Sequence, residues 1–231
     1  EPLVREVTRN IQVKKAMEFI DRAIFREPLN TSGYLDKAEC LTRQKKYEEA
    51  EEIFRQRLET PENNVEEYYI YAKIASLMER KNEVEKAIEN YNISISLENR
   101  NEFIYEAFYN LLLRENRYEE IEIFFLYYQN SKISKEKVLN LEGQYAVHIK
   151  DYERARKICE RLIILNPNDS IHYLNLAYVL EMMKDFDNAL ELIKKANEKT
   201  NDKEIIKKAR KRVIKSKKEY LKLLKQEDKK T

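Results

Sequence analysis

The sequence predicts an all-α protein made of repeated helical hairpins. Among its 231 residues are only two glycines and four prolines, which leaves few places for the tight turns that β-sheets need. Charged residues make up 37% of the chain, and Glu, Lys, Leu and Ile, which suit helices, are abundant. The second observation is a recurring pattern. Residues 46–62, 151–169 and 185–203 each place an aromatic residue three positions before an alanine and an apolar residue four positions after it.

The recurring alanine sets the register of one helix in every hairpin. It recurs, with one substitution, at intervals of 34, 37, 34, 34 and 34 residues; these register residues are Ala16, Ala50, Ala87, Ile121, Ala155 and Ala189. Three positions before them lie Val13, Tyr47, Val84, Tyr118, Tyr152 and Phe186. Four positions after them lie Ile20, Phe54, Tyr91, Phe125, Cys159 and Ile193. These offsets fall on one face of a helix, and a fixed period of this length indicates stacked repeats.

A second pattern predicts another helix before each of these. Twelve residues ahead of the last five register residues, a mostly small residue occurs: Ala38, Ala75, Tyr109, Gly143 and Ala177. Two helices of about a dozen residues joined by a short turn pack antiparallel, and small side chains let their axes approach closely. Pro28 and Pro167 each follow a register residue by twelve positions, where proline ends a helix.

These marks together resemble the tetratricopeptide repeat (TPR), a 34-residue pair of helices with an aromatic residue, Gly or Ala, Tyr, Ala, an aromatic residue and Pro at set positions. The resemblance implies an all-α, right-handed superhelix of antiparallel helical hairpins. It divides residues 1–203 into a partial unit at 1–28 and full units at 31–67, 68–101, 102–135, 136–169 and 170–203.

Two places depart from the pattern. The interval of 37 adds three residues, which fit best in the connection at 60–67. The unit at 102–135 carries Tyr109 and Ile121 where the others carry small residues, so its two helices are expected to lie farther apart or shifted. That unit is also rich in aromatic residues, which suits either a repacked core or a surface for a partner.

The chain ends in a predicted basic capping helix and tail at 204–231. A repeat array needs a terminal helix with a polar outer side. From Lys203 onward there are thirteen basic and four acidic side chains, whereas the rest of the chain has 31 basic and 38 acidic ones. The dense part of this basic patch consists of Lys207, Lys208, Arg210, Lys211, Arg212, Lys215, Lys217 and Lys218.

No set of residues in the sequence predicts catalysis. His148 and His172 lie on separate first helices with no metal-binding spacing, and we interpret both as surface residues. Gly33 and Gly143 cannot form a glycine-rich phosphate loop, and the two cysteines suit a core. We therefore predict no enzymatic activity, no cofactor and no metal site.

Binding is the function that the resemblance implies. In a superhelix of this kind the first helices line a concave groove. The groove residues predicted in this way are Tyr69, Arg80, Phe103, Asn110, Arg114, Asn140, Gln144, His148, Asn175 and Tyr178. Some TPR proteins clamp a C-terminal carboxylate with paired Lys and Asn. Asn110 and Asn175 suit such a clamp, but Glu106, Asn140 and Leu174 stand at the lysine positions, which disfavours it.

The sequence therefore predicts a non-catalytic scaffold or adaptor for a protein or peptide partner. The groove and the aromatic-rich unit remain alternative contact surfaces. A different class of function is attachment to nucleic acid or an anionic membrane through the basic patch, although the acidic body disfavours nucleic acid. Self-association also stays open.

The cellular setting is less constrained. Frequent Lys, Ile, Asn and Glu favour an AT-rich, bacterial genome, and the resemblance then suggests assembly of a cell-envelope or motility complex. The sequence contains no run of 18 apolar residues, so it predicts no membrane span. The compartment is open: cytoplasmic, or periplasmic or membrane-associated if a signal or anchor precedes Glu1.

Overall fold

The structure is a computed structural model that describes residues 2–59, 67–98, 100–128 and 133–227. The chain divides into two compact units, Glu1–Ile121 (unit 1) and Glu122–Thr231 (unit 2). Each unit is described by itself. The described residues form helices without any strand, so the all-α prediction is confirmed.

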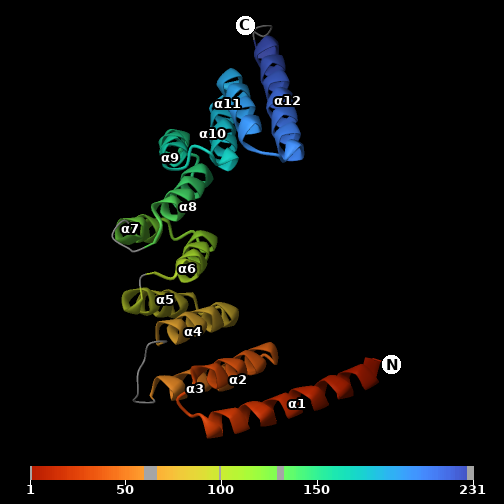
Figure 1. Ribbon diagram of the computed structural model, residues 1–231, viewed down its shortest axis with the longest axis vertical. Coiled ribbons are helices and arrows are strands. Elements are labelled where there is room, and N and C mark those ends of the chain that lie inside the picture. Colours follow the sequence, from red (N-terminus) through yellow and green to blue (C-terminus); the bar gives the residue numbers. More distant parts are fainter. Residues whose placement is uncertain (1, 60–66, 99, 129–132, 228–231) are drawn as a thin grey trace. The chain divides into compact units, whose positions relative to one another are not determined.

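Unit 1 is a row of helices in which each packs against the next in sequence (Figure 1). Its members are α1 (Pro2–Arg26), α2 (Thr31–Arg43), α3 (Tyr47–Leu58), α4 (Glu67–Lys81), α5 (Val84–Leu97) and α6 (Glu102–Arg114). The helix α7 (Tyr118–Tyr128) begins in unit 1 and ends in unit 2.

Unit 2 continues the alternation of first and second helices with α8 (Lys135–His148), α9 (Tyr152–Leu165), α10 (Ser170–Met182) and α11 (Phe186–Lys199). It ends in α12 (Lys203–Glu227), which packs against α11 and also touches α10 (Figure 1). The predicted terminal helix is therefore present, and it covers an apolar cluster with Ile206, Ala209 and Val213.

The turn inside each hairpin has one repeated geometry. A residue with positive φ stands five positions before each of the last five register residues: Lys45, Asn82, Asn116, Lys150 and Lys184, with φ between 56° and 67°. Just after the end of α8, the backbone N–H of Lys150 donates to Val147 O and that of Asp151 donates to Ala146 O. This pair of bonds is the Schellman motif, which satisfies the last carbonyls of a helix. Asp151 also starts the next helix, because its side chain accepts from the Arg154 N–H and so caps that helix.

Except for Ala16, the small residues of the two patterns are buried in the core. Ala38, Ala75 and Ala177 on first helices are fully buried, as are the register residues Ala50, Ala87, Ile121, Ala155 and Ala189. At Gly143 an added Cβ would lie 3.3 Å from Ile158 Cγ2, so α8 and α9 leave little more room than glycine occupies. Ala16 differs from the other register residues because it is exposed on α1.

Both predicted departures fall at places that the structure describes only in part. The three extra residues of the long interval belong to a connection whose residues 60–66 lie outside the described part of the chain. Tyr109 and Ile121 are both buried. The arrangement of α6 against α7 involves the division between the units, so their wider separation stays a prediction. The aromatic-rich stretch is partly core, with Phe124 and Phe125 buried, and partly exposed, with Leu126 and Tyr127 open to solvent.

Candidate partner-binding site

The exposed face of α10 lies between two hollows of unit 2. Asn175 and Tyr178 line both of them. These side chains are three positions apart, so they lie on the same side of the helix, while the buried face of α10 packs Tyr173 and Ala177 into the core. The helix is held at its start by Asp169, whose carboxylate accepts from the Ile171 N–H at 2.8 Å.

The first hollow lies between α10 and the α8–α9 hairpin and has a volume of about 280 Å³. Its polar side chains are the amides Asn140, Gln144 and Asn175, and Tyr178 adds an aromatic ring. Its floor includes Cys159 and Leu162, which are buried. Burial raises the pKa of the Cys159 thiol to about 11, so this cysteine is a neutral, apolar part of the floor at pH 7.

The second hollow lies between α10 and α12 and has a volume of about 490 Å³. Arg212 stacks over the Tyr178 ring, with its guanidinium carbon 5.1 Å from the ring centroid. The same guanidinium donates from Nε to Glu181 Oε2 at 2.7 Å, and Ser216 donates to Glu181 Oε1 at 2.7 Å. Since Glu181 is only 1% exposed, its carboxylate holds the half-exposed Arg212 and α12 in place. The result is a fixed cation and ring at the edge of the hollow.

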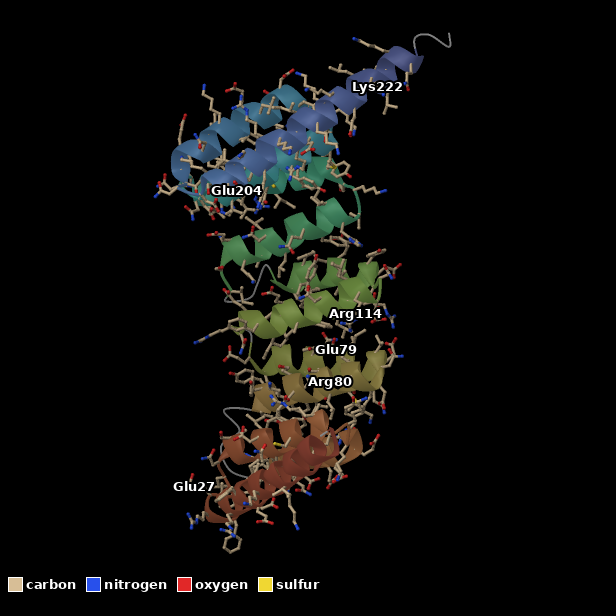
Figure 2. The ribbon with its side chains drawn as sticks, turned by 90° about the vertical axis from the view of Figure 1, so that its right-hand side faces the viewer. Glu27, Glu79, Arg80, Arg114, Glu204 and Lys222 are labelled. Carbon is tan, nitrogen blue, oxygen red and sulfur yellow. The ribbon has the colours of Figure 1, made fainter. Side chains whose placement is uncertain are left out.

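Unit 1 contains a more strongly charged hollow of about 360 Å³ between α4 and α6. Figure 2 shows Glu79, Arg80 and Arg114, which line it. Arg114 donates to Glu79 Oε2 at 2.8 Å, and the buried Tyr91 hydroxyl donates to Glu79 Oε1 at 2.7 Å. Burial and the hydrogen bond to Glu79 both raise the pKa of Tyr91, so Tyr91 stays a neutral donor. Glu79 is thus already occupied by groups of its own unit.

Six of the ten predicted groove residues lie together in two groups. The structure brings Asn140, Gln144, Asn175 and Tyr178 together in unit 2, and it brings Arg80 and Arg114 together in unit 1. The remaining four are Tyr69, half-buried beneath Lys73, and Phe103, Asn110 and His148, which are exposed. A continuous groove through both units stays a prediction.

The basic patch is less uniform than its sequence suggests. Four of its members form ion pairs with other described residues: Lys208 with Glu204, Arg212 with Glu181, Lys215 with Glu219 and Lys217 with Asp187. The Glu181 and Asp187 contacts tie α12 to the preceding hairpin. Figure 2 labels Glu204 at the start of α12 and Lys222 near its end.

Sequence reasoning missed two sets of contacts. It assigned Arg212 to the basic patch alone, whereas Arg212 also borders the α10 hollow. It interpreted His172 as a surface residue, and this is wrong, because His172 is only 2% exposed. The N-terminal ends of α8 and α10 enclose its ring, with Glu136 and Asp169 nearby. The contacts of Arg212 with α10 and of His172 with Glu136 join residues about one repeat apart. The spacing of residues within a single helix cannot predict such contacts.

Two family models match the chain by sequence. The model described as anaphase-promoting complex, cyclosome, subunit 3 matches residues 9–91. A domain of unknown function, DUF6340, matches residues 141–226. A comparison with curated proteins finds no match.

Several solved structures share the fold. The C-terminal part of a TPR repeat-containing protein from Cytophaga hutchinsonii aligns over 85% of this chain and 78% of its own, with 16% identity and a TM-score of 0.61. Yeast Tom70 aligns over 93% of this chain and 46% of its own, with 15% identity and a TM-score of 0.59. YrrB, described as a TPR protein with an unusual peptide-binding site, aligns over 85% of this chain and 100% of its own, with 14% identity and a TM-score of 0.53.

The hairpins, their 34-residue register and their buried small residues define an α-helical repeat protein. The structural neighbours identify the fold more closely. The chain has the fold of tetratricopeptide repeat proteins. Among the described residues, no helix has both the length and the apolar character that crossing a membrane requires.

Proposed function

We propose that the protein is a non-catalytic scaffold that binds an extended peptide segment of a protein partner across the exposed face of α10. The observation that carries this proposal is the pair of hollows that share Asn175 and Tyr178. The TPR fold in general serves protein–protein interaction through the surface of its first helices. The peptide-binding site in the description of YrrB is in keeping with this use of the fold.

The chemistry of the two hollows suits a peptide backbone with an acidic side chain. Amide side chains both donate and accept hydrogen bonds, as a peptide group requires, and three of them border the first hollow. In the second hollow, the bond to Glu181 uses only the Nε donor of Arg212, and a guanidinium carries five N–H donors. Its terminal amino groups are therefore the donors we assign to a partner carboxylate, with Tyr178 as an aromatic anchor.

Display of a random peptide library on phage tests this assignment. Peptides selected on the wild-type protein should bind at least tenfold more weakly to Asn175→Ala and Tyr178→Ala. The matched control is Asn92→Ala, which removes an exposed amide from the second helix α5 and should bind as wild type does. Equal binding by all three variants would exclude the α10 face as the site.

The alternative function is attachment to an anionic surface through the basic patch. The four ion pairs described above reduce the charge that the patch presents, so we place this function second. Its test is salt dependence, because contacts to phosphates weaken steeply as salt rises. Partner capture that survives 0.5 M salt would rule out the basic patch as the main contact, since the Debye length is then about 4 Å.

We also propose, from composition and family alone, that the protein serves assembly of a bacterial envelope or motility complex. Affinity purification from the native cell, with wild-type protein and Tyr178→Ala compared by mass spectrometry, tests this role. Recovery of envelope or motility components by the wild type alone is the expected result. Their absence from both samples would contradict the proposal.

A further inference from the structure

A buried histidine in unit 2 faces two carboxylates. Neither ring nitrogen of His172 makes a hydrogen bond with the described residues. Its Nε2 lies 3.2 Å from Glu136 Oε1 and 3.6 Å from Asp169 Oδ2. A buried imidazole whose nitrogens make no hydrogen bond is costly, so a ligand bound between the ring and the carboxylates would lower this cost.

The three side chains come from the N-terminal ends of two helices. His172 and Asp169 belong to the start of α10, and Glu136 lies in the first turn of α8, after the cap at Ser134. Asp169 is the N-cap of α10, and it uses Oδ1 to accept from the Ile171 N–H. Its second oxygen, Oδ2, is the one nearest His172. The capping bond therefore orients Asp169 without using the oxygen that faces the ring.

The distances from His172 Nε2 to the two carboxylate oxygens fit a tetrahedral metal. Zinc binds histidine nitrogen and carboxylate oxygen at about 2.0–2.2 Å, so neighbouring ligand atoms of a tetrahedron lie about 3.3–3.6 Å apart. The distances from His172 Nε2 to Glu136 Oε1 and Asp169 Oδ2 are 3.2 and 3.6 Å, and the three atoms all lie within 4.8 Å of one another. Water would supply the fourth ligand.

The local charge also favours a dication. Two carboxylates bring a charge of about −2 when ionised. The two helix N-termini oppose a cation with about half a positive charge each, which leaves the site negative. We propose that Glu136, Asp169 and His172 bind one divalent metal ion of the zinc class and thereby join α8 to α10. This role goes beyond partner binding, and the α10 face is not needed for it.

Titration of the untagged, EDTA-treated protein with Co²⁺ and Zn²⁺ tests the site. We expect one ion per chain by calorimetry, visible Co²⁺ absorption bands of a tetrahedral site and a rise in Tm. Asp169→Asn is the informative variant, because asparagine also caps helices but lacks the charge. It and His172→Gln should bind at least tenfold more weakly, while His148→Gln, which changes the exposed histidine, should bind as wild type does.

Two outcomes would overturn the proposal. One is no stoichiometric binding by a protein that circular dichroism shows to be folded. The other is equal binding by wild type and Asp169→Asn, in which case His172 is held by an ion pair with the carboxylates and the ion binds elsewhere.

A second, independent observation concerns the side of α12 that faces away from the α10 hollow. A hollow of about 840 Å³ lies between α11 and α12. Its apolar lining is Leu190, Ile193, Ile206 and Ile214, and its basic lining is Lys194, Lys203, Lys207, Arg210 and Lys211. Glu191 is the one acidic residue in that lining. The members of the basic patch that border this hollow differ from the four that form ion pairs within the protein.

This combination fits an amphipathic helix with acidic flanks. An apolar face in a groove, with charges of opposite sign along the rim, is the usual helix-in-groove arrangement. Phosphates of nucleic acid would use the basic rim but not the isoleucine and leucine floor. We infer that the α11–α12 hollow binds an acidic amphipathic helix of a protein partner.

Fluorescence anisotropy tests this surface. The probe is a labelled 18-residue peptide that has leucines at helical spacing and glutamates beside them. A peptide of scrambled order should bind at least tenfold more weakly. Ile214→Asp and Lys211→Glu should each weaken binding about tenfold, whereas Lys218→Glu, which alters an exposed lysine outside the hollow, should leave it within twofold. Tighter binding of phosphatidylserine vesicles or of single-stranded DNA, unaffected by Ile214→Asp, would overturn the inference.

Discussion

Each hairpin turn contains one position whose backbone conformation glycine would adopt more easily than the residue present. Lys45, Lys150 and Lys184 adopt positive φ, a conformation that costs a residue with a Cβ roughly 1–2 kcal/mol. Asparagine, at the two other turns, tolerates this region better. The fold therefore imposes the left-handed turn on lysine, because the two Schellman bonds, donated by the lysine and by the residue after it, require that backbone.

The first prediction concerns Lys150, which can be tested against its neighbour. Lys150→Gly should raise the free energy of unfolding by about 0.5–1 kcal/mol, since glycine adopts positive φ without strain. Ile149→Gly, at a residue with φ of −81°, should instead lower it by about 1 kcal/mol. Urea unfolding followed by circular dichroism measures both. Destabilisation by both variants would show that strain at Lys150 is small.

The register of each helix could be predicted because its marks lie within one helix. Ala155, three residues after Tyr152, identifies a buried face without reference to any other part of the chain. The left-handed turns could not be predicted in this way, because lysine is a poor indicator of positive φ. Contacts between hairpins, such as Glu136 with His172 or Glu181 with Arg212, were also missed. They depend on how successive hairpins are placed, and only coordinates supply that placement.

At the scale of the helical element, close packing rests on the register residues. Ala189 is fully buried against its hairpin partner, whereas Ala16 holds the same register position on α1 and is exposed. On each second helix, the register residue and the residues three before and four after it form one face. This face packs on the first helix of the same hairpin. The described residues contain no such helix before α1.

This contrast gives the second prediction. Ala189→Leu should lower the free energy of unfolding by about 1–3 kcal/mol, because it forces extra atoms into a filled core. Ala16→Leu should change it by no more than about 0.5 kcal/mol. Thermal unfolding of the two variants, compared with wild type, provides the measurement. A similar loss in both would mean that Ala16 is packed as tightly as Ala189.

At the scale of the whole molecule, ion pairs recur about one repeat apart. Lys81 contacts Glu51, Arg114 contacts Glu79, Arg154 contacts Glu122 and Arg212 contacts Glu181, over separations of 30 to 35 residues. The first three each join a hairpin to the next one in sequence, and the fourth joins the last hairpin to α12. In a repeat protein, stability is approximately a sum of such neighbour terms, so these pairs should make stability depend on pH.

The third prediction uses Glu51 to test that dependence. Burial alone would raise its pKa, but hydrogen bonds from Arg55 and Lys81 hold the pKa of Glu51 below its ordinary value of 4.5. A lowered pKa in the folded state means that the ionised carboxylate stabilises the fold. This stabilisation is complete above the unfolded-state pKa and is lost as the pH falls through the folded-state pKa.

Glu51→Gln should therefore lower the free energy of unfolding at pH 7 by about 0.5–1 kcal/mol, the range for a partly exposed pair. The difference from wild type should shrink as the pH falls below about 4.5 and vanish once the wild-type carboxyl is protonated. Glu52→Gln, at the exposed neighbouring carboxylate, should differ little from wild type at either pH. Urea unfolding at pH 7, 5, 4 and 3 follows all three proteins. If the difference in free energy of unfolding between wild type and Glu51→Gln stays constant down to pH 3, the effect comes from packing. A contribution from the carboxylate charge would disappear when the carboxylate is protonated.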